Sequence, residues 1–290
     1  TRGGVAPLRA AVRLRETLLA EAPSGFFERI EVAAPGFLNF HLTDSALRAA
    51  LRGITAAGES YGGSRAGRGR RVIVEYSSVN VAKPMHVGHL RATVLGDALA
   101  NIHTFLGYEV IRWNYLGDWG TQFGKTISAY KLWGSRETVE RNPIAELVSL
   151  YVRFHDEARS RPELDRMAQE EFRALEAGDR ENRRLWRWFR RLSLTEFRRL
   201  YALLGVRFDS YLGESFYEPM LKPLIARLVT EGITEESQGA LIVPLAEEKL
   251  PPALVRKSDG SSLYLTRDLA NLEYRLSTFK PAKILYVVGN

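Results

Sequence analysis

Two histidines three residues apart are the first candidates for chemistry in this sequence. His86 and His89 stand at the predicted start of a helix, where free backbone N–H groups and the helix dipole favour an anion. A positive charge is disfavoured at that end, so we expect two neutral imidazoles unless a phosphate arrives to hold the proton. Gly88, between them, lacks the Cβ that would keep a flat ligand away from the backbone. The pattern predicts a phosphate and nucleotide site.

Two other interpretations of the histidine pair stay open at this point. Histidines at helical spacing can bind zinc, but the sequence has no cysteine and no carboxylate at the matching turn, so we expect no metal site. A lone His-x-x-His pair is also compatible with an ordinary helix start. The functional interpretation is favoured by the polar residues on either side, which are Glu75 and Asn80 before the pair and Gly117 and Asp118 after it.

A strand-helix-strand unit must position these residues. Residues 72–74 are apolar and end at Glu75, which predicts a buried strand, and a second strand is predicted at 109–115. The helix predicted between them ends at Gly107 and has an apolar stripe: Leu90, Val94, Leu95, Ala98, Ile102 and Phe105. The right-handed crossover rule makes the two strands parallel. Ligands of such sheets lie beyond the carboxyl ends of the strands, where the polar residues named above fall together with Ser77 and Ser78.

A second group of candidate residues lies near the end of the sequence. Thr266 is predicted to cap a helix whose apolar stripe is Leu269, Leu272, Leu276 and Phe279, with Asp268 in its first turn. The helix dipole alone would explain a carboxylate there. Tyr264, four residues earlier, and a predicted strand at 284–288 that returns to the sheet favour a site instead.

Together these motifs resemble arginyl-tRNA synthetases, a family of class I aminoacyl-tRNA synthetases. His86-Val87-Gly88-His89 is similar to their His-Ile-Gly-His signature. The flanking words are similar as well: Val74-Glu75-Tyr76-Ser77-Ser78, Asn80-Val81-Ala82-Lys83-Pro84-Met85, Gly117-Asp118-Trp119-Gly120-Thr121-Gln122-Phe123-Gly124 and, later, Glu214-Ser215-Phe216-Tyr217. Tyr264 and Asp268 match the arginine-pocket residues of the family's Leu-Tyr-x-Thr-Arg-Asp word. Val79 departs from the pattern, because many relatives have proline there.

The resemblance implies a fold and a domain organisation. The fold class is α/β, with a doubly wound, Rossmann-like parallel-sheet catalytic domain that carries a helical insertion, preceded by a small partial α+β domain. The boundaries we expect are 1–63 for the N-terminal tRNA-binding domain, 64–70 for a glycine-rich linker and 71–290 for the catalytic domain, with the insertion at about 126–250. We expect the chain to be a fragment that lacks the start of the N-terminal domain and the anticodon-binding domain.

The same resemblance implies an activity, the ATP-dependent activation of L-arginine to arginyl-adenylate and its transfer to tRNA(Arg). It assigns catalytic roles to His86, His89 and Lys83, the last in place of a second lysine-containing signature that is absent from the sequence. Arginine would be bound by Glu75, Ser78, Asn80, His89, Tyr264 and Asp268, and ATP by His86, Gly88 and His89. Mg²⁺ would arrive with ATP. A non-catalytic RNA-binding or regulatory fragment that retains the arginine pocket is the alternative.

Composition and charge agree with this assignment. With 290 residues, 45% of them hydrophobic, the chain can bury a substantial core, and it has no cysteine for disulfides. We expect a cytoplasmic monomer that does not enter a membrane. Residues 180–207 contain nine arginines and only Glu181 and Glu196 as acids, so this segment carries the whole net charge of +7. A contact with RNA phosphates and an ordinary solvated helix surface explain this stripe equally well.

Overall fold

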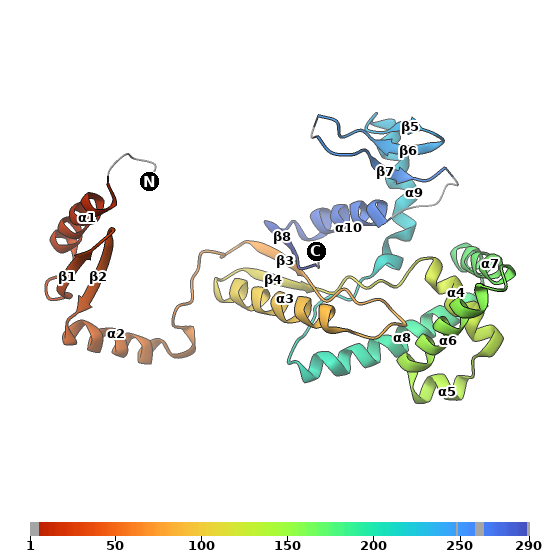
Figure 1. The fold of residues 1–290 in the computed structure, drawn as a ribbon, viewed down its shortest axis with the longest axis horizontal. Coiled ribbons are helices and arrows are strands. Elements are labelled where there is room, and N and C mark those ends of the chain that lie inside the picture. Colours follow the sequence, from red (N-terminus) through yellow and green to blue (C-terminus); the bar gives the residue numbers. More distant parts are fainter. Residues whose placement is uncertain (1–5, 248, 259–263, 289–290) are drawn as a thin grey trace. The chain divides into compact units, whose positions relative to one another are not determined.

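The computed structural model describes residues 6–247, 249–258 and 264–288. The chain forms two compact units, Thr1–Gly63 and Ser64–Asn290 (Figure 1). The first unit has α1 (Pro7–Glu21), a hairpin of β1 (Phe27–Ala33) and β2 (Phe37–Leu42), α2 (Asp44–Ala57) and the short 3-10 helix Gly58–Ser60. The sequence offers Thr43 or Asp44 as the cap of α2, and the structure confirms Thr43, whose side chain accepts a hydrogen bond from the backbone N–H of Ala46.

One expectation for this unit is wrong. The helical spacing of α2 predicts that Leu47 and Leu51 face inward, but their exposed fractions are 51% and 63%. The helix extends away from the hairpin, so the described part of this unit leaves its apolar face uncovered (Figure 1). An apolar stripe indicates which side of a helix could be buried, and only the neighbouring elements decide whether it is.

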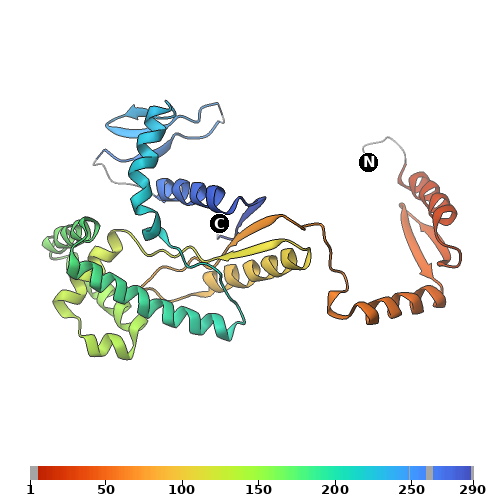
Figure 2. The ribbon, with the colours of Figure 1, turned by 180° about the vertical axis from the view of Figure 1, so that it is seen from behind.

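The second unit is built on a three-stranded parallel sheet. Its order is β4 (Glu109–Trp113), β3 (Arg71–Glu75) and β8 (Lys283–Tyr286), with β3 paired to both neighbours. Helices α3 (Val87–Phe105) and α10 (Tyr264–Phe279) lie on opposite sides of this sheet in both views (Figures 1 and 2). The α/β class and the parallel sheet predicted from the sequence are therefore confirmed.

Helix α3 packs on the sheet with a different face from the one its apolar spacing predicts. Its buried residues are Thr93, Gly96 and Ala100. Most of the predicted stripe is exposed: Leu90, Val94, Leu95, Ile102 and Phe105. The reason is the close approach of the helix to β3, because a Cβ on Gly96 would lie 2.2 Å from the Cβ of the buried Tyr76. Small residues allow that approach, whereas large apolar ones would hold the helix away.

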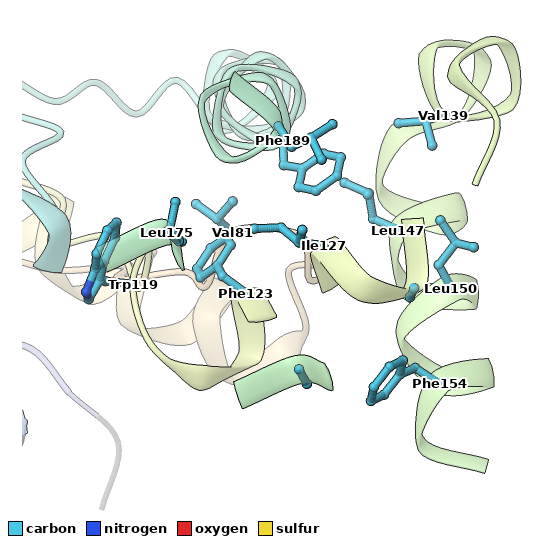
Figure 3. Close-up of a cluster of buried hydrophobic side chains, with 14 of the residues drawn as sticks. Val81, Trp119, Phe123, Ile127, Val139, Leu147, Leu150, Phe154, Leu175 and Phe189 are labelled. Atoms are coloured by element: carbon cyan, nitrogen blue, oxygen red, sulfur yellow. The ribbon is translucent and has the colours of Figure 1, made fainter. Parts of the chain in front are cut away.

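A helical region follows β4, as predicted, and breaks at 142–143 and at 161–162. Its helices are α4 (Thr121–Trp133), α5 (Arg136–Arg141), α6 (Pro143–Ala158), α7 (Glu163–Ala177) and α8 (Arg180–Leu203). They share one apolar core that includes Phe123, Ile127, Phe154 and Phe189 (Figure 3). None of the described helices combines the length and the apolar character that crossing a membrane would require.

The chain returns to the sheet through α9 (Glu214–Thr230), a small antiparallel sheet of β5 (Glu235–Ser237), β6 (Ala240–Val243) and β7 (Ala253–Arg256), and then α10. The predicted cap at Thr266 is wrong, since α10 is already helical at Tyr264. Thr266 is buried, and its Oγ1 donates a 2.5 Å hydrogen bond to the carbonyl of Val255, which joins α10 to β7. Residues 259–263 of the predicted second site lie outside the described residues.

The packing of α3 gives a first prediction. Gly96→Ala should destabilise the protein by roughly 1–3 kcal/mol, because overpacking a rigid core contact forces backbone or side-chain shifts. The matched control is Gly53→Ala in α2, where an added Cβ meets nothing within 4 Å and should stabilise its helix by about 0.5–1 kcal/mol. Urea unfolding curves measure both. A Gly96→Ala protein as stable as wild type would show that α3 is less tightly packed than described.

Candidate active site at the carboxyl ends of the strands

A buried ion pair occupies the carboxyl end of β3. Glu75 is 4% exposed and Arg275, on α10, is fully buried. Arg275 Nη2 donates to Glu75 Oε2, and the guanidinium lies over the Trp113 ring, 4.6 Å from its centroid. Burial raises the pKa of Glu75, and the charge of Arg275 opposes that rise. Glu75 was predicted from the sequence as a site residue, whereas Arg275 was missed.

Asp268 and Tyr264 lie on the exposed part of α10. Asp268 is exposed, and its charge helps to raise the pKa values of both Glu75 and Tyr115, so these three groups are neighbours. The Tyr115 hydroxyl is buried beside the Asp268 carboxyl, where it opposes the rise that burial causes in the pKa of Asp268. Tyr264 is 70% exposed, and the guanidinium of Arg267 lies over its ring at 6.0 Å from the centroid. The structure therefore gathers Glu75 and Asp268 around one aromatic side chain.

The loop after β3 is held in an unusual backbone conformation. Ser77 has φ of 73° and Ser78 has φ of 49°, a region that residues with a Cβ rarely adopt. The Ser77 hydroxyl is tied to the Tyr201 hydroxyl at 2.7 Å, whereas Ser78 Oγ is buried without a partner in the described part of the chain. Strained residues with unpaired polar atoms are concentrated at functional sites. The loop thus leaves one buried serine hydroxyl without a hydrogen-bond partner in the described chain.

Asn80 is placed by backbone contacts with Gly117, which follows β4. The two residues form an isolated parallel bridge, and Val81 N donates to the Gly117 carbonyl at 3.0 Å. A Cβ on Gly117 would lie 1.8 Å from Asn80 Oδ1, so only glycine permits this approach. Gly117 therefore helps to set the position of Asn80.

The two histidines form a reciprocal cap at the start of α3. His86 Nδ1 accepts from Gly88 N at 3.2 Å, and His89 Nδ1 accepts from His86 N at 3.3 Å. A ring nitrogen that accepts an N–H carries no proton, so the proton of each neutral imidazole is on Nε2. Burial and the neighbouring His86 lower the pKa of His89, which favours that neutral form. The two ring centroids are 3.9 Å apart, and each ring has an Nε2–H that takes no part in the cap.

The structure gives a reason for glycine at position 88 that differs from the one inferred from the sequence. A Cβ at Gly88 would lie 3.0 Å from His86 Cε1 and 3.2 Å from His86 Nδ1. The ring would have to move, and the cap would be disturbed. Glycine at this position therefore leaves room for the ring of His86. That it also gives a flat ligand access to the backbone stays a prediction.

Lys83 and Asp118 have different surroundings from these residues. Lys83 Nζ lies 5.5 Å from the centroid of the Tyr151 ring on α6. Asp118 is fully buried and holds the sheet to two helices, because it accepts Arg190 Nε of α8 at 2.7 Å and Ser215 N of α9 at 2.9 Å. Its carboxylate is thus occupied, and Asp118 is a structural residue of this site.

The arginine-rich stripe is narrower than the sequence predicts. Arg190 is paired with Asp118, and the Arg198 guanidinium lies 5.0 Å from the centroid of the Tyr211 ring, so both belong to internal contacts. A hollow of about 1020 Å³ runs along the other side of α8. Its lining is strongly basic and includes Arg136, Arg180, Arg183, Arg184, Arg187 and Arg191. Contact of this surface with RNA stays a prediction.

Glu214 is a second residue that the sequence did not single out for chemistry. It is the first residue of α9, is 8% exposed and has a buried Oε2 without a hydrogen-bond partner among the described residues. Burial raises its pKa to about 7, Arg267 opposes the rise, and Asp118 and Asp268 add to it. Acids at helix starts are common, so only the tertiary neighbours distinguish this one.

The described residues contain no cluster of three or more side chains that would hold a metal ion.

The family "tRNA synthetases class I (R), catalytic domain" matches residues 51–290. The chain is 49% identical over 285 residues to an arginine--tRNA ligase of Clostridioides difficile, covering 97% of this chain and 50% of that protein. It is 50% identical over 274 residues to the arginine--tRNA ligase of Enterococcus faecalis, covering 94% and 48%.

Solved structures give the same result for the fold. The arginyl-tRNA synthetase of Plasmodium falciparum matches with a TM-score of 0.70 at 29% identity, covering 94% of this chain and 48% of that one. The Thermus thermophilus arginyl-tRNA synthetase also gives 0.70 at 29%, covering 93% and 45%. The chain thus spans about half the length of the curated relatives and solved structures it matches.

The raised pKa of Glu214 gives a prediction for stability. An acid with a pKa of about 7 in the folded protein and 4.5 as its ordinary value binds more protons when folded, so stability falls as pH rises between those values. Glu214→Gln removes this titration. The variant should therefore gain on the order of 3 kcal/mol relative to wild type between about pH 4 and about pH 8. Urea unfolding at both pH values measures it, and a difference that does not change with pH would contradict the assignment.

Proposed function

The chain belongs to the arginyl-tRNA synthetase family of class I synthetases, and on that premise we propose that it activates L-arginine with ATP and transfers it to tRNA(Arg). The chemistry has two steps. The arginine carboxylate attacks the α-phosphorus of ATP, a new P–O bond forms, and pyrophosphate leaves with the electrons of the broken P–O bond. A ribose hydroxyl of the tRNA then attacks the carbonyl of the adenylate, loses its proton and expels AMP.

The observation that carries the proposal is the reciprocal cap of the two histidines. It occupies both Nδ1 atoms and leaves both Nε2–H groups as neutral donors at a helix N-terminus. Negative charge accumulates on phosphate oxygens as pyrophosphate leaves, and fixed donors stabilise that charge at little reorganisation cost. We assign His86, Gly88 and His89 to ATP. Mg²⁺ enters with the ATP phosphates as part of the substrate, and Lys83 adds positive charge in the loop just before the pair.

The arginine site follows from the carboxylates. A guanidinium is planar and permanently charged, so carboxylates and aromatic hydroxyls recognise it best. We propose that Asp268 and Glu75 supply the charge and that the exposed Tyr264 supplies a wall and a hydroxyl. Ser78, whose hydroxyl is unpaired in the described chain, and Asn80 would hold the ammonium and carboxylate of the amino acid, with His89 beside them. The absence of cysteine suits the reducing cytoplasm, where we place the reaction.

The histidine assignment is tested by arginine-dependent ATP–pyrophosphate exchange in the natural full-length protein, with tRNA present. His86→Ala and His89→Ala should each lower the exchange rate about 10²- to 10³-fold while arginine still binds, because one transition-state donor is lost. His86→Ser separates the two roles of the residue, since serine is a good helix cap and has no imidazole.

His86→Ser should regain the stability lost in His86→Ala and stay equally slow in exchange. His103→Ala, in the last turn of the same helix, is the matched control and should exchange at the wild-type rate. A His86→Ser protein with wild-type activity would reduce the histidine to a helix cap.

Asp268→Asn tests the arginine site. It removes one formal charge but keeps the size of the side chain, and hydrogen bonds to charged groups contribute about 1.5–3 kcal/mol, so arginine should bind roughly 10- to 150-fold more weakly. Stability should change by less than about 1 kcal/mol because the residue is exposed. Calorimetric titration and melting curves measure the two effects. Asp156→Asn, at an exposed carboxylate of α6, is the control, and a variant that melts early but binds arginine normally would refute the assignment.

A further inference from the structure

We propose that Arg275 is a positioning residue of the arginine pocket, which holds the Glu75 carboxylate so that its second oxygen faces the guanidinium of the substrate. The inference rests on the proposed function, because it concerns how the same pocket is built. It assigns a role to a residue that nothing in the sequence motifs marks, at the far end of the helix that carries Tyr264 and Asp268.

The two oxygens of the Glu75 carboxylate have different surroundings. Arg275 Nη2 donates to Glu75 Oε2, and within the described residues no hydrogen bond reaches Oε1. The aromatic rings around the guanidinium fix its plane, with centroids at 4.6 Å for Trp113, 5.7 Å for Tyr286 and 6.0 Å for Tyr115. A planar group held on several sides keeps the bonded carboxylate in one orientation.

The pair is poorly explained as a device for stability. Arg275 is fully buried, and its Nε and Nη1 atoms have no hydrogen-bond partner of good geometry in the described chain, although the hydroxyls of Tyr217 and Tyr286 interact with the guanidinium. Unpaired buried donors cost free energy, and replacing a buried ion pair by apolar residues is often neutral or stabilising. Stability therefore does not explain why Arg275 is buried beside Glu75. Binding of a cation by the Glu75 carboxylate explains it better.

Charge balance gives the functional reason. The titratable groups that face this pair are Asp268, Tyr115, Tyr217 and Tyr286. Burial raises the pKa of each of them, and Asp268 is the one carboxyl group among the four. Without Arg275, burial and the charge of Asp268 would both favour a neutral Glu75, which binds a cation weakly. With the carboxylates of Glu75 and Asp268 and the guanidinium of Arg275 all charged, the pocket has a net charge of −1, which matches a single incoming guanidinium.

The test is a double-mutant cycle in the natural full-length protein, with three variants: Arg275→Met, Glu75→Gln and the two together. Arg275→Met alone leaves a buried carboxylate without its partner, so it should lose stability as well as arginine affinity. The double variant removes both charges and keeps the volume, so it should regain the stability. Its arginine affinity should stay about 10- to 150-fold below wild type, because the charged acceptor is gone.

Two further measurements separate positioning from a merely structural role. The KM for ATP should stay at the wild-type value in the double variant, while L-citrulline, the neutral counterpart of arginine, should bind with nearly the same affinity as in wild type. Arg275→Lys keeps the charge without the planar fork, and should recover part of the arginine affinity lost in Arg275→Met.

A double variant with the melting temperature and arginine affinity of wild type would overturn the inference. This variant can be measured even if Arg275→Met alone fails to fold. Equal losses for arginine, citrulline and ATP would overturn it too, because they indicate a general distortion. Failure of the proposed function is a different result. In that case the wild-type protein itself shows no binding of arginine and no arginine-dependent exchange.

Discussion

A charge buried at the end of a strand is the constraint on which this site depends. Glu75 ends β3, and its ion pair with Arg275 joins that strand to a helix 200 residues later in the chain. A carboxylate in that position is costly unless it is paired. The pair therefore requires α10 to cover the sheet beside Trp113, and that placement brings Asp268 next to Glu75 and Tyr115.

The groups that we propose to bind phosphate also have a structural role. His86 and His89 satisfy backbone N–H groups that any helix start must satisfy, and by doing so they settle which ring nitrogen carries the proton. Gly88 and Gly117 provide the close approaches that this arrangement and the placement of Asn80 need. Asp118 also lies near the site, but its carboxylate already accepts hydrogen bonds from Arg190 and Ser215, so we do not assign it to ligand binding.

The sequence predicted the positions of local elements better than it predicted the faces that pack. The residues of the loop after β3 and of the α3 start are short-range neighbours, so their positions follow from the strand and helix that flank them. The buried face of α3 was predicted wrongly, because Thr93, Gly96 and Ala100 are buried, with Gly96 against Tyr76, while the larger residues are exposed. Apolar spacing reports hydrophobicity, whereas close packing of a helix on a sheet selects for small volume.

The sequence by itself determined the family, the parallel strand-helix-strand unit and the two histidines at a helix start, because local spacing and contiguous words carry that information. Only the tertiary structure showed that Glu75 is paired with Arg275, that Thr266 joins α10 to β7 instead of capping a helix, and that Glu214 is buried with a raised pKa. Each depends on residues far apart in the chain. A side chain's charge state and partners follow from its surroundings in space, and one-dimensional patterns do not record them.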